Sequence, residues 1–350
     1  MLKNKKMLYF SSEMWYNRYI TKEELLMEIR KQIEEREKKI LSPFAAFSSD
    51  SKGRDVFEEP DDVRTCYAID RDRIIHSFSF RKEKDKTQVF IMPQNDHCMN
   101  RLTHTLEVTQ VAKSIAVALG LNETLTEAIA LGHDTAHTCF GHAGERALNN
   151  LYKEGYSHSL EVKRRLNVLE KKNLTKEVID GISKHSGLSN RPNAITLEGQ
   201  IVPFADKIAY LTSDYENAVE MGIIKGLPER VMRSLGTTKG EIIDTLISSI
   251  IRSSYEKNQI MMDEEVFKEM VYFREFAFNE IYFSDKLMKE NQKAEHIIQH
   301  LYEYFVKHPK EMTEISDYHD IERSVVDYIA GMTDNYALTT YEKHFSLRHL

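Results

Sequence analysis

Apolar residues recur at helical spacing along most of the chain. In the clearest stretch the repeating apolar positions are Leu106, Val111, Ile115 and Leu119. Gly120 follows and is placed to end this helix. Asn122 is placed to cap the next helix, which the pattern extends to about Gly132. Two helices joined by a short turn are therefore expected over this part of the chain.

The same periodicity predicts helices elsewhere. The expected ranges are 21–40, 200–221, 239–255, 263–279, 284–308 and 320–329. Residues 48–70 mix Ser, Gly, Asp and Pro and predict a long, partly ordered connection. Residues 86–92 contain the only short run that could pass for a strand. The pattern indicates a mainly α bundle, with neither an internal repeat nor a low-complexity tract.

Composition agrees with a globular body. The chain has 350 residues, 41% of them hydrophobic and 29% charged, so it can bury a large core. One large helical body with a C-terminal extension is favoured over two independent domains. The net charge of −7 disfavours nonspecific duplex binding but leaves room for a local basic pocket.

The cellular setting follows from cysteines and hydropathy. Three unpaired cysteines, Cys66, Cys98 and Cys139, are typical of reduced thiols. The apolar stretch Met7 to Phe10 is too short for a signal-peptide core, and no run approaches the length of a membrane span. We expect a cytoplasmic protein without a membrane partner.

One short run, residues 130–145, concentrates the chemistry. Its side chains of interest are His133, Asp134, His137, His142 and Glu145. Imidazole and carboxylate ligands together suit Mn, Fe, Co or Ni better than Mg or Ca, which favour oxygen ligands. The run predicts a metal-dependent hydrolase.

Residues on neighbouring helices can complete the metal site. His104 begins one predicted helix and the His133-Asp134 doublet ends the next, so a short antiparallel turn could bring them together. Further on, Asp206, Tyr210 and Asp214 are spaced four apart on one helical face, with Lys207 beside them. Without the histidines, this face would simply be the polar side of an amphipathic helix.

His142 and Glu145 form a second candidate pair. They are three apart at the start of a predicted helix, so they face the same way. A carboxylate fixes the tautomer of an imidazole and raises its basicity, as a general acid or base near neutral pH requires. A lone histidine is more often a hydrogen-bonded core residue, but three within ten residues make that interpretation improbable.

Ordered sequence blocks carry a family resemblance. They are Arg-Asp-Arg-Ile-Ile-His-Ser from 71, Lys-Thr-Gln-Val-Phe from 86, Asn-Arg-Leu-Thr-His-Thr-Leu-Glu-Val from 100, the His-Asp run, Leu-Glu-Gly-Gln-Ile-Val-Pro-Phe-Ala-Asp-Lys-Ile-Ala-Tyr from 197 and Asp-Tyr-Ile-Ala-Gly-Met-Thr-Asp from 327. In this order they resemble the deoxyguanosinetriphosphate triphosphohydrolase family of HD-domain proteins, from about residue 20 onward.

The resemblance implies an all-α HD-domain bundle with a helical C-terminal extension. It also implies hydrolysis of a deoxynucleoside triphosphate, dGTP or another dNTP, to deoxynucleoside and inorganic triphosphate. The matched metal ligands are His104, His133, Asp134 and Asp206, and the matched catalytic pair is His142 with Glu145. The matched substrate contacts are Arg101, His137, His158 and Lys207 for phosphate, and Gln88, Tyr210 and Asp214 for deoxyribose. Tyr328 and Asp334 lie in a family block near the pocket, without an assigned role.

The resemblance also implies partners and an organisation. The expected metal is Mn²⁺, with Mg²⁺, Fe²⁺, Co²⁺ or Ni²⁺ as alternatives, and the expected assembly is a tetramer or hexamer with a nucleotide activator. Tyr272, Phe273, Phe276, Phe278, Tyr282 and Phe283 are read either as an interface or as core. We expect an N-terminal helix and connection over 1–60, the HD core over 61–225, and a C-terminal region over 226–350 that completes the pocket and forms an oligomer interface.

Three departures from the family pattern leave substrate preference open. Thr135-Ala136 stands where Leu-Gly is common, Thr138-Cys139 where Pro-Pro is common, and Ser213 where a histidine is common. Apart from substrate preference, two other functions stay open. One is an HD hydrolase of another nucleotide, either a 5′-nucleotidase or a signalling-nucleotide hydrolase. The other is a nucleotide sensor without catalysis.

Overall fold

Helices account for all the regular secondary structure in the described part of the chain. The computed structural model describes residues 22–93, 95–187, 189–317 and 319–347. The α-helices are α1 (Lys22–Ile40), α2 (Cys66–Ile75), α3 (Phe78–Lys82), α4 (Arg101–Ala118), α5 (Glu123–Gly132), α6 (Gly141–Leu151), α7 (His158–Val162), α8 (Lys176–Ser183), α9 (Leu197–Glu220), α10 (Glu229–Ser234), α11 (Lys239–Ser254), α12 (Glu264–Ala277), α13 (Asp285–Lys307), α14 (Ile321–Ala330) and α15 (Asp334–Phe345). The all-α prediction is confirmed.

Shorter helical turns join several of these elements. The 3₁₀ turns are Ser48–Asp50, Glu83–Asp85 and Pro309–Glu311, and π-helical turns at Lys163–Leu169 and Phe278–Tyr282 continue α7 and α12. Among the described residues, no helix combines the length and apolar composition needed to cross a bilayer. The Met7 to Phe10 stretch and Thr21 lie outside the described residues.

Local sequence signals explain where α4 and α5 begin. Asn100 caps α4, because its side chain accepts a hydrogen bond from the Thr103 amide while the Thr103 hydroxyl accepts one from the Asn100 amide. The side chain of Asn122 accepts hydrogen bonds from the second and third amides of α5. The predicted turn between these helices is confirmed, and it places the first turn of α4 beside the end of α5.

Two expectations need correction. The connection predicted over 48–70 ends earlier, because Thr65 caps α2 and the apolar side chains of Tyr67 and Ile74 bury against the core. Residues 86–92 form no strand; one isolated bridge joins Thr87 to Asn100, and no neighbouring strand exists among the described residues to extend it. This segment instead runs along the site described below.

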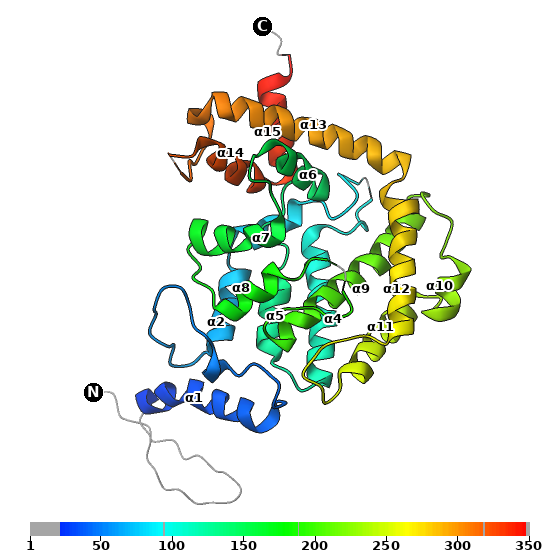
Figure 1. The fold of residues 1–350 in the computed structure, drawn as a ribbon. Coiled ribbons are helices and arrows are strands. Elements are labelled where there is room, and N and C mark those ends of the chain that lie inside the picture. Colours follow the sequence, from blue (N-terminus) through cyan, green and yellow to red (C-terminus); the bar gives the residue numbers. More distant parts are fainter. Residues whose placement is uncertain (1–21, 94, 188, 318, 348–350) are drawn as a thin grey trace, which may run out of the picture.

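Two hydrophobic clusters form the core. The larger one centres on α4, which packs against α5 and α9, while α2, α8 and α11 close around them. The smaller one joins α6 to α13 and α14. Figure 1 shows α13, α14 and α15 together at one end of the molecule, with α6 beside them and α1 at the opposite end. The segment before α6 joins the two clusters, because Ala136 belongs to the larger one and Cys139 and Phe140 belong to the smaller one.

Candidate functional site

Four side chains from three helices converge beside the core. His104 comes from the first turn of α4, His133 and Asp134 from the turn that directly follows α5, and Asp206 from the middle of α9. The His104 Nε2 atom lies 3.2 Å from Asp206 Oδ1 and 3.8 Å from Asp134 Oδ2. The His133 Nε2 atom lies 3.4 Å from Asp134 Oδ2. The structure thus brings together all four predicted metal ligands.

The donor atoms of this cluster fit a divalent ion. His133 Nδ1 lies 2.6 Å from the Ala130 carbonyl oxygen and so carries the proton, which leaves the Nε2 lone pair facing the carboxylates. Among the described residues, neither His133 Nε2 nor either ring nitrogen of His104 has a hydrogen-bond partner. Burial lowers the pKa of His133, which favours its neutral, metal-binding form. Unpaired buried nitrogens beside two carboxylates are the pattern expected of metal ligands.

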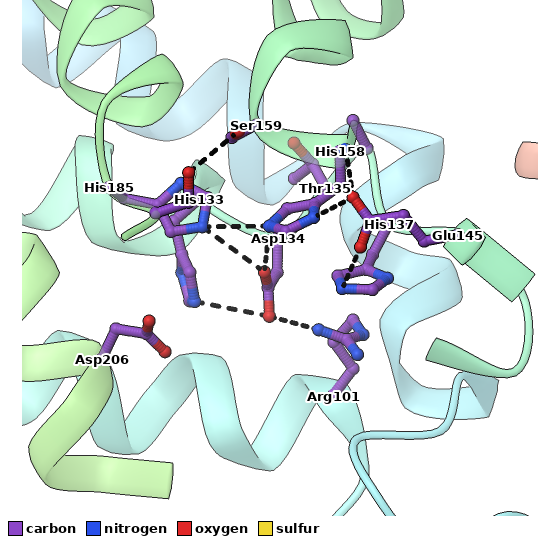
Figure 2. A network of polar contacts seen from close by, with 12 residues as sticks. Arg101, His133, Asp134, Thr135, His137, Glu145, His158, Ser159, His185 and Asp206 are labelled. Carbon is purple, nitrogen blue, oxygen red and sulfur yellow. Dashed lines mark hydrogen bonds and ion pairs between the residues drawn. The ribbon is translucent and has the colours of Figure 1, made fainter. Parts of the chain in front are cut away.

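Asp134 is the electrostatic centre of the cluster. In Figure 2 its carboxylate lies between the Arg101 guanidinium and the His133 ring. Burial alone would raise the pKa of Asp134, but the surrounding histidines and Arg101 hold it well below its usual range. Arg101 is itself buried and also donates to the Thr87 carbonyl oxygen at 2.9 Å. Arg101 therefore links the 86–92 segment to the His-Asp cluster.

His185 is a member of this site that sequence reasoning missed. Its Nδ1 lies 2.6 Å from the Ile182 carbonyl oxygen, and its Nε2 lies 4.0 Å from Asp134 Oδ1 and 3.2 Å from His158 Nε2. Burial lowers the pKa of His185 to about 3, so it is neutral. The only signal in the sequence was a lone histidine, which by itself indicates nothing.

A second cluster lies around Glu145 on α6. Glu145 Oε2 lies 2.9 Å from His142 Nδ1, and Oε1 lies 2.8 Å from His158 Nδ1. The rings of His137 and His158 stack with centroids 4.3 Å apart. Burial would lower the pKa of His158, but the Glu145 carboxylate outweighs it and raises that pKa. The predicted His142–Glu145 pair is thus formed, and His158 shares the same carboxylate.

A cavity of about 850 Å³ connects the two clusters. The predicted residues on its wall are Gln88, Arg101, Asp134, His137, His142, Glu145, His158, Asp206, Lys207, Tyr210 and Asp214. His142 stands at the exposed edge, with 63% of its side chain accessible, whereas His104 and His133 are fully buried behind the wall. Tyr328 and Asp334 do not line this cavity.

The far end of the cavity comes from α12 and the turn after it. Tyr282 donates a hydrogen bond to Asp214 at 2.7 Å, and burial raises the pKa of Asp214 to about 7. The Arg274 guanidinium lies 4.4 Å from the centre of the Phe278 ring, and its Nε has no partner among the described residues. The sequence analysis predicted either an interface or a core position for Phe278 and Tyr282. The structure places both on the cavity wall. Arg274, which also lines the cavity, was not identified from the sequence.

The first turn of α6 requires a glycine at position 144, where it packs against the preceding turn. A Cβ added there would lie 2.1 Å from the Cys139 carbonyl oxygen and 2.7 Å from Thr138 Oγ1. We expect Gly144→Ala to lower the free energy of unfolding by about 1–3 kcal/mol, as overpacking does. Urea denaturation measures this change.

Gly240→Ala in the first turn of α11 is the matched control. Nothing lies within 4 Å of the Cβ that it adds. We expect it to leave the free energy of unfolding unchanged or to raise it by up to about 1 kcal/mol. Equal stability of the two variants would show that the turn before α6 is not tightly packed.

Comparisons with known proteins agree with this geometry. The HD domain family matches residues 101–211, and the phosphohydrolase-associated domain family matches residues 260–343. An all-helical fold around a His-Asp cluster, together with these two matches, defines an HD-domain phosphohydrolase.

Curated relatives narrow this class to one family. A deoxyguanosinetriphosphate triphosphohydrolase-like protein of Caldanaerobacter subterraneus subsp. tengcongensis is 46% identical over 329 residues, which cover 91% of this chain and 96% of the relative. One of the same name from Clostridium perfringens is 44% identical over 333 residues, covering 91% and 97%. Another, from Geobacter sulfurreducens, is 36% identical over 365 residues, covering 87% and 95%. The chain belongs to the family of deoxyguanosinetriphosphate triphosphohydrolase-like proteins.

Proposed function

We propose that this protein hydrolyses deoxynucleoside triphosphates, dGTP among them, to deoxynucleoside and inorganic triphosphate. The observation that carries the proposal is the shared cavity, in which a cluster able to hold a divalent ion and a histidine–carboxylate pair face the same space. The names of the relatives point to the same substrate class. In this proposal the core over 61–225 supplies both clusters, and the region over 226–350 closes the far end of the cavity.

The proposed reaction is attack of water on the α-phosphorus. The water oxygen bonds to phosphorus, the bond from phosphorus to O5′ breaks, O5′ takes up a proton, and the water oxygen leaves within the triphosphate. Mn²⁺, or Mg²⁺, Fe²⁺, Co²⁺ or Ni²⁺ in its place, would be held by His104, His133, Asp134 and Asp206 and would supply Lewis-acid polarisation of a phosphate oxygen.

Cationic and polar side chains of the wall would bind the triphosphate. Arg101 and Lys207 offer positive charge, and the Lys207 Nζ already lies 3.3 Å from Asp206 Oδ2, so one cation can serve both the cluster and a phosphate oxygen. Both ring nitrogens of His137 are buried without a partner among the described residues. A phosphate oxygen in the cavity would provide the acceptor that His137 lacks.

His142 would move the proton. Its Nδ1 is held by Glu145, which leaves Nε2 at the exposed edge of the cavity free to exchange a proton with the water or with O5′. The Glu145 carboxylate stabilises the charged imidazole that forms when His142 accepts a proton. Glu145 lies between His142 and His158. These two imidazoles offset the cost of burial and hold the pKa of Glu145 far below its usual range, so Glu145 is ionised.

The function is tested by product analysis. The purified protein would be incubated with each dNTP, alone and in mixtures, with Mn²⁺ or Mg²⁺, and the products separated by ion exchange. Deoxynucleoside with intact triphosphate supports the proposal and ranks the bases. Monophosphate with pyrophosphate would assign the site to another phosphohydrolase reaction, and no product under any mixture would favour a nucleotide sensor.

Tyr210 is proposed to exclude ribonucleotides. Its ring lies on the cavity wall one helical turn beyond Asp206 and would crowd C2′ of the bound sugar. We expect kcat/KM for dGTP to exceed that for GTP by roughly a hundredfold, the scale at which a filled pocket rejects one added hydroxyl. Tyr210→Ala should remove most of this preference, measured as the ratio of the two kcat/KM values.

Tyr210→Phe is the matched control, since it keeps the ring and removes only the hydroxyl. It should retain the preference for dGTP. Equal turnover of GTP and dGTP by the unaltered protein would contradict the role of the ring.

A further inference from the structure

Two buried charged side chains lie next to the site without lining its cavity. Lys86 precedes the Thr87–Gln88 segment, and Asp334 is the first residue of α15. Their exposed fractions are 3% and 6%. Burying an ionisable group is costly unless hydrogen bonds satisfy it. The hydrogen-bond partners of Lys86 and Asp334 therefore show which parts of the backbone these side chains support.

Lys86 connects the turn between α5 and α6, residues 133–140, to the C-terminal helices. Its ammonium group donates to the carbonyl oxygen of His137 and, at 3.1 Å, to that of Ala330 at the end of α14. One side-chain nitrogen thereby links the backbone of a cavity residue to a helix almost two hundred residues later in the chain. A flexible surface lysine could not fix a backbone in this way, because its ammonium group would exchange its partners for water.

Asp334 holds the other end of the same turn. Its Oδ1 accepts a hydrogen bond from the Phe140 amide at 2.7 Å. Its Oδ2 accepts hydrogen bonds from the Thr87 hydroxyl and, at 2.9 Å, from the Thr87 amide. Both carboxylate oxygens are engaged by protein groups, which leaves Asp334 as a support for the backbone.

Phe140 is the point at which this support matters. Its φ of 58° lies in the left-handed region, which is unfavourable for a residue with a side chain. It is also the N-terminal cap of α6, and its side chain forms no capping hydrogen bond. His142 follows two residues later. A strained residue at the start of a helix persists only where its surroundings hold it, and here the Asp334 carboxylate does so.

We infer that Lys86 and Asp334 are positioning residues that hold residues 137–140 so that His137 and His142 face the cavity. This inference rests on the proposed function, because it assigns to the C-terminal region a part in aligning the group that moves the proton. Asp334 acts through the backbone rather than by contact with substrate. The two residues together are called the Lys86–Asp334 bracket.

Asp334→Asn tests the bracket with little change in shape. An amide has one accepting oxygen, so it cannot serve both Phe140 and Thr87. We expect kcat/KM for the best dNTP to fall on the order of tenfold to a hundredfold, as a misplacement of about 1 Å does, with metal content unchanged. Lys86→Met, which removes the donor from the other side of the turn, should give a fall of the same kind.

Asp327→Asn is the matched control. Asp327 is 5% exposed on the neighbouring α14, and it binds Arg164 and Arg323 rather than the turn before α6. Compared at equal folded fraction, this variant should keep its activity. A loss equal to that of Asp334→Asn would mean that any disturbance of the C-terminal helices has the same effect, and would overturn the inference.

A double-mutant cycle shows whether the bracket acts through His142. In a His142→Ala background, adding Asp334→Asn should lower kcat/KM by a smaller factor than in the unaltered protein, because one of the two groups being positioned is already gone. An undiminished loss in that background would overturn the inference.

Hydrogen exchange separates failure of the bracket from failure of the proposed function. With either bracket variant, amides of residues 132–148 should exchange faster than in Asp327→Asn, whether or not any dNTP is a substrate. Unchanged exchange would overturn the bracket. Faster exchange in a protein that turns over no dNTP would instead overturn the proposed function.

Discussion

Replacing His104 with alanine is expected to remove the bound ion and abolish turnover. His104 is fully buried, and both of its ring nitrogens lack a hydrogen-bond partner among the described residues, which is the pattern expected of a metal ligand. Lewis-acid stabilisation is worth several kcal/mol, so the rate should fall about 10³-fold or more. Asp206→Ala should also lose the ion and turnover, because the Asp206 carboxylate lies 3.2 Å from His104 Nε2.

Metal analysis and single-turnover rates measure this result together. His76→Ala is the control, since His76 is an exposed histidine at the end of α2, away from the cavity. It should keep both metal and activity. A His104→Ala protein that binds one ion per chain and turns over at the original rate would remove His104 from the metal site.

Replacing His142 with alanine is expected to leave metal content unchanged and to lower kcat by roughly 10²–10⁴-fold, the contribution of a positioned acid or base. The reason lies in the separation of the two clusters. His142 contacts Glu145 rather than any of the four predicted ligands, and 63% of its side chain is exposed at the edge of the cavity. Its loss should therefore disturb neither the ion nor the core.

The measurement is kcat at saturating metal and substrate, alongside metal content. Glu145→Gln should lower kcat as well, because an amide cannot stabilise a charged imidazole as a carboxylate does. Activity of His142→Ala equal to that of the original protein under saturating metal would show that another group moves the proton.

Local sequence patterns were sufficient to predict much of the fold. Asn100 and Asn122 occupy helix caps that depend only on neighbouring residues, and the turn between α4 and α5 follows from Gly120. The extended run around Val89 looked like a strand because it is apolar. Its side chains bury against the core while its backbone serves Arg101, a tertiary arrangement that apolar content alone does not encode.

The candidate site was predictable where its residues lie at helix ends close in sequence. His133 and Asp134 belong to one turn, and His104 lies at the start of the preceding helix. Arg274 and Tyr282 reach the same cavity from α12 and the turn after it, and no local periodicity specifies how that helix packs on α9. Asp334 lies in a sequence block that resembles the family. Its hydrogen bond with the Phe140 amide, however, could be seen only in the structure.

The most direct test of the central claim is the reaction in ¹⁸O-labelled water. The metal-loaded protein would be incubated with its best dNTP. The products would then be separated, and the ¹⁸O content of each would be measured by mass spectrometry. Water attack at the α-phosphorus predicts an unlabelled deoxynucleoside and a triphosphate that carries one ¹⁸O. A labelled deoxynucleoside, or a monophosphate released with pyrophosphate, would contradict the account.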